Sequence, residues 1–324
     1  MNCSSTTSCS TADNTEVFDL IDISIEILKE RDGDRKSERT LKTLDLYTQG
    51  RVSVQGGQHV EGLDCRHASV PLIPGRNENL EYVTPGRVKR RGKGGTLASR
   101  QSMLHSLVHI ESCAIDLAWD IIARFGTHAD WKGVLPEEFY VDFLIVAADE
   151  ARHYQELKKR LRELGMEFGE LPVHDGLWES ALNTKDSLPA RLAIEHCTHE
   201  ARGLDVLPQT IDRFRKGGDE PSAALLENVI YPEEITHCAA GVKYLTFLYG
   251  FAKEYEGHDP PASWITEAQQ YESVEHWFHG LVRQYFHGLL KPPFNEKARS
   301  AAGFSPEWYI PLSVEHQDNQ KASC

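Results

Sequence analysis

Two copies of one short motif constrain this chain more than any other feature of its sequence. The first copy reads Asp149-Glu150-Ala151-Arg152-His153, and the second reads Glu233-Glu234-Ile235-Thr236-His237. Each is an acid followed by Glu-x-x-His, and each lies in a long segment with helical periodicity. Residues three apart share one face of a helix, so the Glu and His of each copy can bind one ion together.

A helical segment with a glutamate of its own precedes each motif. Glu111 and Glu200 are both followed by an Asp five positions later and by an Arg-Phe pair that starts thirteen positions later. This predicts a duplicated helix pair. We place the four helices at 99–125, 138–164, 188–216 and 221–249. Pro208 and Pro232 fall inside the last two, so a kink or a break is predicted at each.

The glutamates of these helices lie in apolar stripes. Steps of three and four residues from each of them reach mainly aliphatic and aromatic side chains. An unpaired buried carboxylate costs several kcal/mol or is forced to protonate, so four of them together require compensation by cations. The sequence therefore predicts a site for two metal ions with four carboxylates and two imidazoles as ligands: Glu111, Glu150, His153, Glu200, Glu234 and His237. Oxygen ligands with one nitrogen per ion favour iron, or else manganese, over zinc and copper.

Some neighbouring residues leave alternatives open. Glu195 competes with Glu200 as the ligand from the third helix, but its neighbours at helical spacing include charged side chains. Arg152 and Arg202 are candidates for contact with an anionic substrate or for salt bridges. His105 and His109 lie on other helix faces than Glu111, so we expect structural hydrogen bonds from them.

The rest of the chain extends this core on both sides. We predict a disordered tail at 1–16, N-terminal helices and an irregular arm at 17–98, the core at 99–250, and a C-terminal helix with a Pro/aromatic tail at 251–324. The N-terminal helices are placed at 17–30 and 36–49, and the C-terminal helix at 263–290. Strand signals are sparse, so the predicted fold class is all-α.

With these motifs the chain resembles the ferritin-like superfamily over roughly residues 85–310. Within it, the chain is similar to a family known as a ferritin-like domain of unknown function, related to tRNA hydroxylases and to di-iron oxygenases and oxidases. The motifs that carry the resemblance are HSLVHIE at 105–111, DEARHY at 149–154, HEARGLD at 199–205, EEITH at 233–237 and LKPPFNEKARSAAG at 290–303. The resemblance implies a four-helix bundle around a di-iron or di-manganese centre, with the six ligands named above. It also implies that Asp149 hydrogen-bonds His237 and that Glu233 hydrogen-bonds His153, as a second layer around the metals.

We therefore expect an oxidoreductase, an oxygenase or oxidase that uses O2 to hydroxylate, desaturate or oxidatively cleave a small organic substrate. No nucleotide-binding or flavin motif is visible, so electrons would come from a separate reductase or from the substrate. The alternatives are a ferritin-type metal storage protein, a tRNA-modifying hydroxylase and non-redox metal catalysis. The segments outside the core favour an enclosed pocket over a storage cage.

Charge and composition restrict the partners. The net charge of −14 argues against a nucleic acid as a partner. The basic cluster GRVKRRGKGG at 86–95 remains a candidate for binding an anion. No apolar run is long enough to span a membrane. Seven cysteines without a CxxC motif, and a first segment unlike a secretory signal, predict a cytoplasmic protein. The sequence leaves open whether the protein forms a homodimer.

Overall fold

The computed structural model describes residues 17–54, 69–87, 92–131, 133–257 and 261–314. Within them the protein is mostly helical, which confirms the all-α class, and the strands are one short parallel pair, β1 (Phe18–Asp19) with β2 (Val52–Ser53). The predicted tail at 1–16 and residues 88–91 of the basic cluster lie outside the described residues. Among the helices of the described chain, none combines the length and the apolar composition needed to cross a bilayer.

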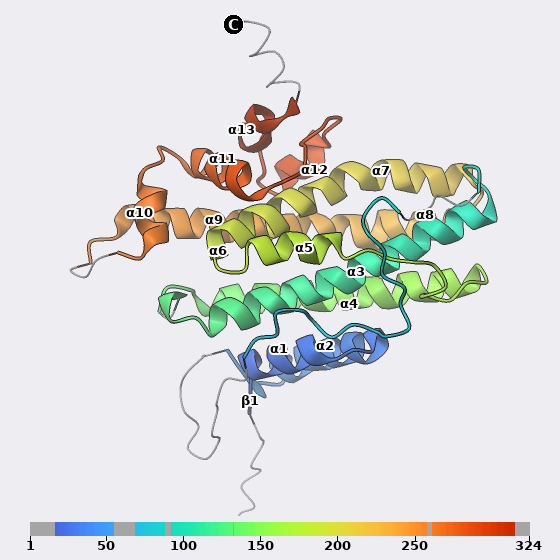
Figure 1. The fold of residues 1–324 in the computed structure, drawn as a ribbon, viewed down its shortest axis with the longest axis horizontal. Coiled ribbons are helices and arrows are strands. Elements are labelled where there is room, and N and C mark those ends of the chain that lie inside the picture. The colour runs from blue at the N-terminus through green and yellow to red at the C-terminus, as the bar shows by residue number, and fades with distance from the viewer. Residues whose placement is uncertain (1–16, 55–68, 88–91, 132, 258–260, 315–324) are drawn as a thin grey trace, which may run out of the picture.

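Four long helical segments lie side by side through the middle of the molecule (Figure 1). They are α3 (Leu97–Gly126), α4 (Glu137–Glu163), the run from α6 (Leu188–Arg191) through η2 (Leu192–His199) to α7 (Glu200–Lys216), and the run from α8 (Glu220–Leu225) through η3 (Leu226–Ile230) to α9 (Tyr231–Glu254). Their limits agree with the sequence prediction to within two residues, except that α9 continues through Gly250 and ends at Glu254, five residues beyond the predicted end. α3 packs on α4, and α9 packs on η2 and α7.

The flanking helices cover opposite sides of these four segments (Figure 1). On one side lie α1 (Leu20–Lys29) and α2 (Gly33–Thr48), and on the other lie α10 (Ser263–Gln269), α11 (Val274–Tyr285), α12 (Glu296–Ala301) and α13 (Pro306–Tyr309). A short helix, α5 (Gly176–Asn183), contacts α3 and η2.

The two aspartates of the repeated motif anchor these coverings. Asp116 accepts hydrogen bonds from Lys36 on α2 and from Arg76, and both Lys36 and Asp116 are buried. In the second half Asp205 accepts from Arg299 on α12, at 2.6 and 2.9 Å. The repeated Asp therefore has the same role in both halves, because a buried carboxylate needs a cation beside it.

The helical runs continue past both prolines, and one predicted helix is divided. α7 runs through Pro208 without a break, and Pro232 lies in the first turn of α9, directly after η3. A proline leaves the carbonyl four residues earlier without its helical donor, and here Asn295 Nδ2 donates to the Leu204 carbonyl at 3.0 Å instead. The predicted helix at 263–290 is two helices, because Ser273 is extended and its hydroxyl caps a new helix by accepting from the His276 N–H.

η2 and η3 are π-helical; η2 ends directly before Glu200, and η3 ends one turn before Glu234. Such segments are rare and occur often at functional sites. η2 also lies against α9 at very close range, since a Cβ added to Gly241 would meet the His196 carbonyl oxygen at 2.1 Å. The sequence prediction gives no sign of either π-helical segment.

Candidate metal centre

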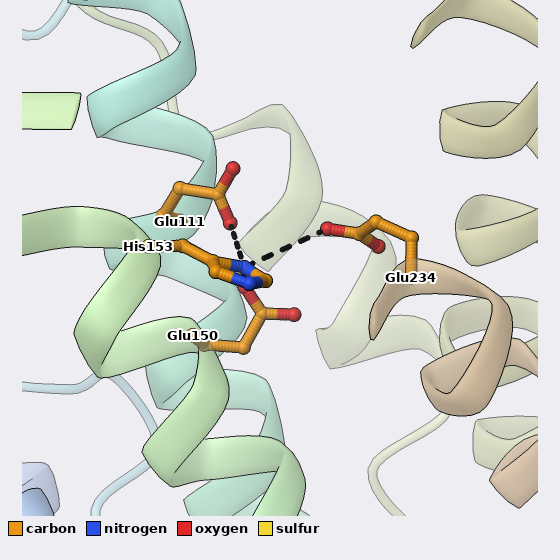
Figure 2. Close-up of side chains that lie close together, drawn as sticks. All are labelled: Glu111, Glu150, His153 and Glu234. Carbon is orange, nitrogen blue, oxygen red and sulfur yellow. Dashed lines mark ion pairs between the residues drawn. The ribbon is translucent and has the colours of Figure 1, made fainter. Parts of the chain in front are cut away.

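All six predicted ligands converge between the four long segments. Glu111 comes from α3, Glu150 and His153 come from α4, Glu200 begins α7, and Glu234 and His237 come from α9. Figure 2 shows Glu111, Glu150, His153 and Glu234, whose side chains point toward one another from three helices. Four members are deeply buried, with exposed fractions of 1–4%: Glu111, Glu150, His153 and His237.

The six residues form two overlapping groups. Glu111, Glu150, His153 and Glu234 each offer one ligand atom within 4.8 Å of the others, and so do Glu150, Glu200, Glu234 and His237. Glu150 and Glu234 belong to both groups, and each has two carboxylate oxygens. This buried Glu/His cluster could hold a metal ion at either group.

The atoms that face the centre lack hydrogen-bond partners. Among the buried side-chain atoms of the described residues that have no partner, four belong to the predicted ligands: Glu111 Oε2, Glu150 Oε2, His153 Nδ1 and His237 Nδ1. His153 Nδ1 lies 3.5 Å from Glu150 Oε2 and 3.6 Å from Glu111 Oε2. His237 Nδ1 lies 2.9 Å from Glu150 Oε1, yet without the geometry of a hydrogen bond. Buried polar atoms are normally satisfied, so four orphans around one point fit a site for cations.

The protonation of the cluster gives the same indication. Burial raises the pKa of Glu111 well above its usual value, and the neighbouring Glu150 raises it further. Burial also raises the pKa of Glu200 strongly, together with Glu234 and Glu150. Burial disfavours charged His153 and His237, but the surrounding carboxylates hold the pKa of both well above the usual value. Without cations the cluster thus retains protons, which metal ions would replace.

The outer nitrogen of each histidine is oriented by a carboxylate of the opposite helix. His153 Nε2 lies 2.6 Å from Glu233 Oε2, and His237 Nε2 lies 3.4 Å from Asp149 Oδ2. Both pairs that the resemblance implied are therefore within hydrogen-bond distance. A proton held on Nε2 leaves the lone pair of Nδ1 toward the centre, which is the tautomer that a metal ligand requires.

The structure separates several of the sequence alternatives. Arg152 is a salt-bridge partner, with Asp149 at 3.0 Å and Glu233 at 2.5 Å. Glu195 is fully buried but belongs to neither ligand group; its Oε1 accepts from Ser180 at 2.8 Å. His105 Nε2 accepts from the Gly169 N–H, and His109 Nε2 lies 2.8 Å from the His174 carbonyl, as expected of structural histidines.

A cavity of about 410 Å³ adjoins the carboxylates. It lies between α3 and the η2–α7 run, and the segment 172–177 covers it. Glu111, Glu150, Glu200 and Glu234 all contribute to its wall. The sequence does not predict this cavity, because the segment that covers it has no helical periodicity and part of its space comes from the missing side chain of Gly203. The one indication in the sequence was that Glu195 and Arg202 lie close to the predicted ligands.

Comparison with known proteins supports a single relationship. A family model described as protein of unknown function (DUF455) matches residues 29–310. An uncharacterised protein of Haemophilus influenzae is 34% identical over 223 residues, which cover 69% of this chain and 70% of that protein. No solved structure matches the chain.

Proposed function

The chain belongs to the DUF455 family, and we propose that it is a ferritin-like non-haem di-metal oxidoreductase that uses O2 to oxidise a small organic substrate. The observation that carries the proposal is the pair of ligand groups that share Glu150 and Glu234. Four carboxylates and two imidazoles between four helices are the ligand set of carboxylate-bridged di-iron and di-manganese proteins, and iron is the expected metal.

Each protein group has a definable task. His153 and His237 would bind through Nδ1, with Glu233 and Asp149 holding the Nε2 protons. Glu111, Glu150, Glu200 and Glu234 would supply the carboxylate ligands of the ions. Reduced metal ions held there would supply electrons to O2, and a separate reductase or the substrate would restore them. The apolar side chains packed between the helices would keep bulk water away from the carboxylates. The cavity between α3 and α7 would give a substrate access to them.

The cavity also favours an enzyme over the storage alternative. A storage protein needs a polar path for ions, whereas the surface of this cavity is mainly apolar outside the carboxylates and histidines that line it, and the segment 172–177 covers it. The net charge of −14 disfavours the tRNA-hydroxylase alternative.

Metal analysis combined with oxygen uptake tests the proposal. The purified full chain, loaded with ferrous iron, should hold about two ions and consume O2 with a chemical reductant. The double variant Glu150→Ala/His237→Ala should lose both properties and keep its helical circular dichroism. A matched control is Glu163→Ala/His276→Ala, which removes the same residue types from exposed positions.

The outcomes are distinct. Many irons per chain would support storage, and two ions without oxygen uptake would support non-redox chemistry. Two ions retained by the Glu150→Ala/His237→Ala variant would refute the ligand assignment.

A further inference from the structure

The cavity beside the carboxylates is long and mainly apolar. Its walls include Leu107 and Leu117 on α3 and Val206 and Leu207 on α7. Its lining residues on the η2–α7 run extend from Glu195 to Thr210, which corresponds to about 20 Å along a helix. A volume of about 410 Å³ spread over such a length fits an elongated ligand better than a compact one.

Gly203 supplies part of this room. It lies inside α7 and lines the cavity, and a Cβ added there would meet no heavy atom within 4 Å. Glycine in a helix interior is less favourable than alanine by about 1 kcal/mol, so Gly203 makes the protein less stable than an alanine at this position would. The absence of a side chain keeps the middle of the cavity open, one turn beyond Glu200.

The opening of the cavity carries an arginine. Ile110 and Val206 line the cavity and are 45% and 47% exposed, and Arg202 is an exposed lining residue next to them on α7. Among the described residues no hydrogen bond or ion pair is recorded for Arg202, whereas Arg152 has two carboxylate partners. An unpaired guanidinium at an apolar opening is suited to a carboxylate, which it can bind with two parallel hydrogen bonds.

We propose that the cavity binds an elongated apolar carboxylic acid of the acyl-chain type, with its chain between α3 and α7 and its carboxylate at Arg202. The chain passes the wall formed by Glu111 and Glu200, where the proposed metal centre would act on it. The role of this ligand as substrate rests on the proposed function; its binding does not.

Direct binding of palmitate to the delipidated full chain tests this proposal without any activity measurement. Displacement of a fluorescent fatty acid gives the affinity, with hexadecanol as the uncharged ligand of equal length. Palmitate should bind several-fold more tightly than hexadecanol. Gly203→Phe should weaken both ligands roughly tenfold or more, because the ring occupies the cavity. Gly203→Leu is the smaller variant if the Phe variant does not fold.

A matched pair of arginine variants tests the carboxylate site. Arg202→Gln should remove the preference for palmitate over hexadecanol. Arg213→Gln, an exposed arginine on the same helix that does not line the cavity, should leave it unchanged. Equal affinity of the wild type and Gly203→Phe for palmitate would show that the fatty acid does not bind in this cavity. Equal affinity of the wild type for palmitate and hexadecanol would show that the protein does not recognise the carboxylate.

Iron content measured on the same samples separates this inference from the proposed function. Two irons per chain without palmitate binding would end the inference alone. Palmitate binding that Gly203→Phe abolishes, in a chain that holds no iron, would end the proposed function alone.

Discussion

Glu233 on α9 lies across the helix interface from His153 on α4, with 2.6 Å between its Oε2 and His153 Nε2. The reverse contact, from Asp149 on α4 to His237 on α9, spans 3.4 Å. The acid before each Glu-x-x-His motif thus serves the histidine of the other motif. This exchange couples the two halves of the repeated sequence at the point where their ligands meet.

The contact predicts how metal affinity depends on Glu233. Glu233→Ala should weaken metal binding about 10- to 100-fold, because His153 loses the group that fixes its tautomer. Glu233→Gln should weaken it less, since the amide oxygen can still accept. Competition with a chelator measures both affinities. Glu227→Ala, at an exposed position of η3, is the control, and an unchanged affinity in Glu233→Ala would contradict the assigned role.

Two helical glycines should respond oppositely to one substitution. Gly241→Ala places a methyl group against the His196 backbone, so α9 and η2 must separate, at a cost of roughly 1–3 kcal/mol. Gly203→Ala meets open space and should stabilise the protein by up to about 1 kcal/mol. Urea unfolding at equilibrium measures both changes. Equal effects at the two positions would show that the close packing of η2 on α9 is absent in solution.

His105 should contribute to the pH dependence of stability. Burial lowers its pKa to about 4, so the folded protein keeps it neutral while the unfolded chain takes up a proton near pH 6.5. The unfolded state therefore binds more protons between these values, and stability falls as the pH is lowered through this window. His105→Gln should reduce the loss of Tm between pH 7 and pH 5. His276→Gln, at an exposed site, should keep the wild-type slope; a wild-type slope in His105→Gln would contradict the prediction.

Much of the helical framework could be predicted from the sequence. Apolar periods followed by glycines define the ends of α3, α4 and α7 to within two residues, whereas α9 continues through Gly250 to Glu254. The helical spacing of Glu150 with His153, and of Glu234 with His237, is local and needs no tertiary information. The repeated spacing of Asp and Arg-Phe after Glu111 and Glu200 indicated that these two glutamates have equivalent positions. The structure places both beside the Glu-x-x-His motifs.

What the sequence could not supply depends on contacts between distant segments. Inside α7 at Pro208, the Leu204 carbonyl accepts its hydrogen bond from the side chain of Asn295, ninety-one positions away in the sequence. The burial of Asp116 requires Lys36 from α2, and no periodicity within α3 reveals that partner. The cavity is lined both by Gly203 on α7 and by the covering segment 172–177, so it arises from the packing of several segments and not from any one helix.

Anomalous diffraction from crystals of the iron-loaded protein, recorded on both sides of the iron absorption edge, tests the metal centre most directly. The account predicts two adjacent iron peaks, one among Glu111, Glu150, His153 and Glu234 and the other among Glu150, Glu200, Glu234 and His237. Iron peaks elsewhere, or side chains of these residues turned outward with no peak between them, would contradict it.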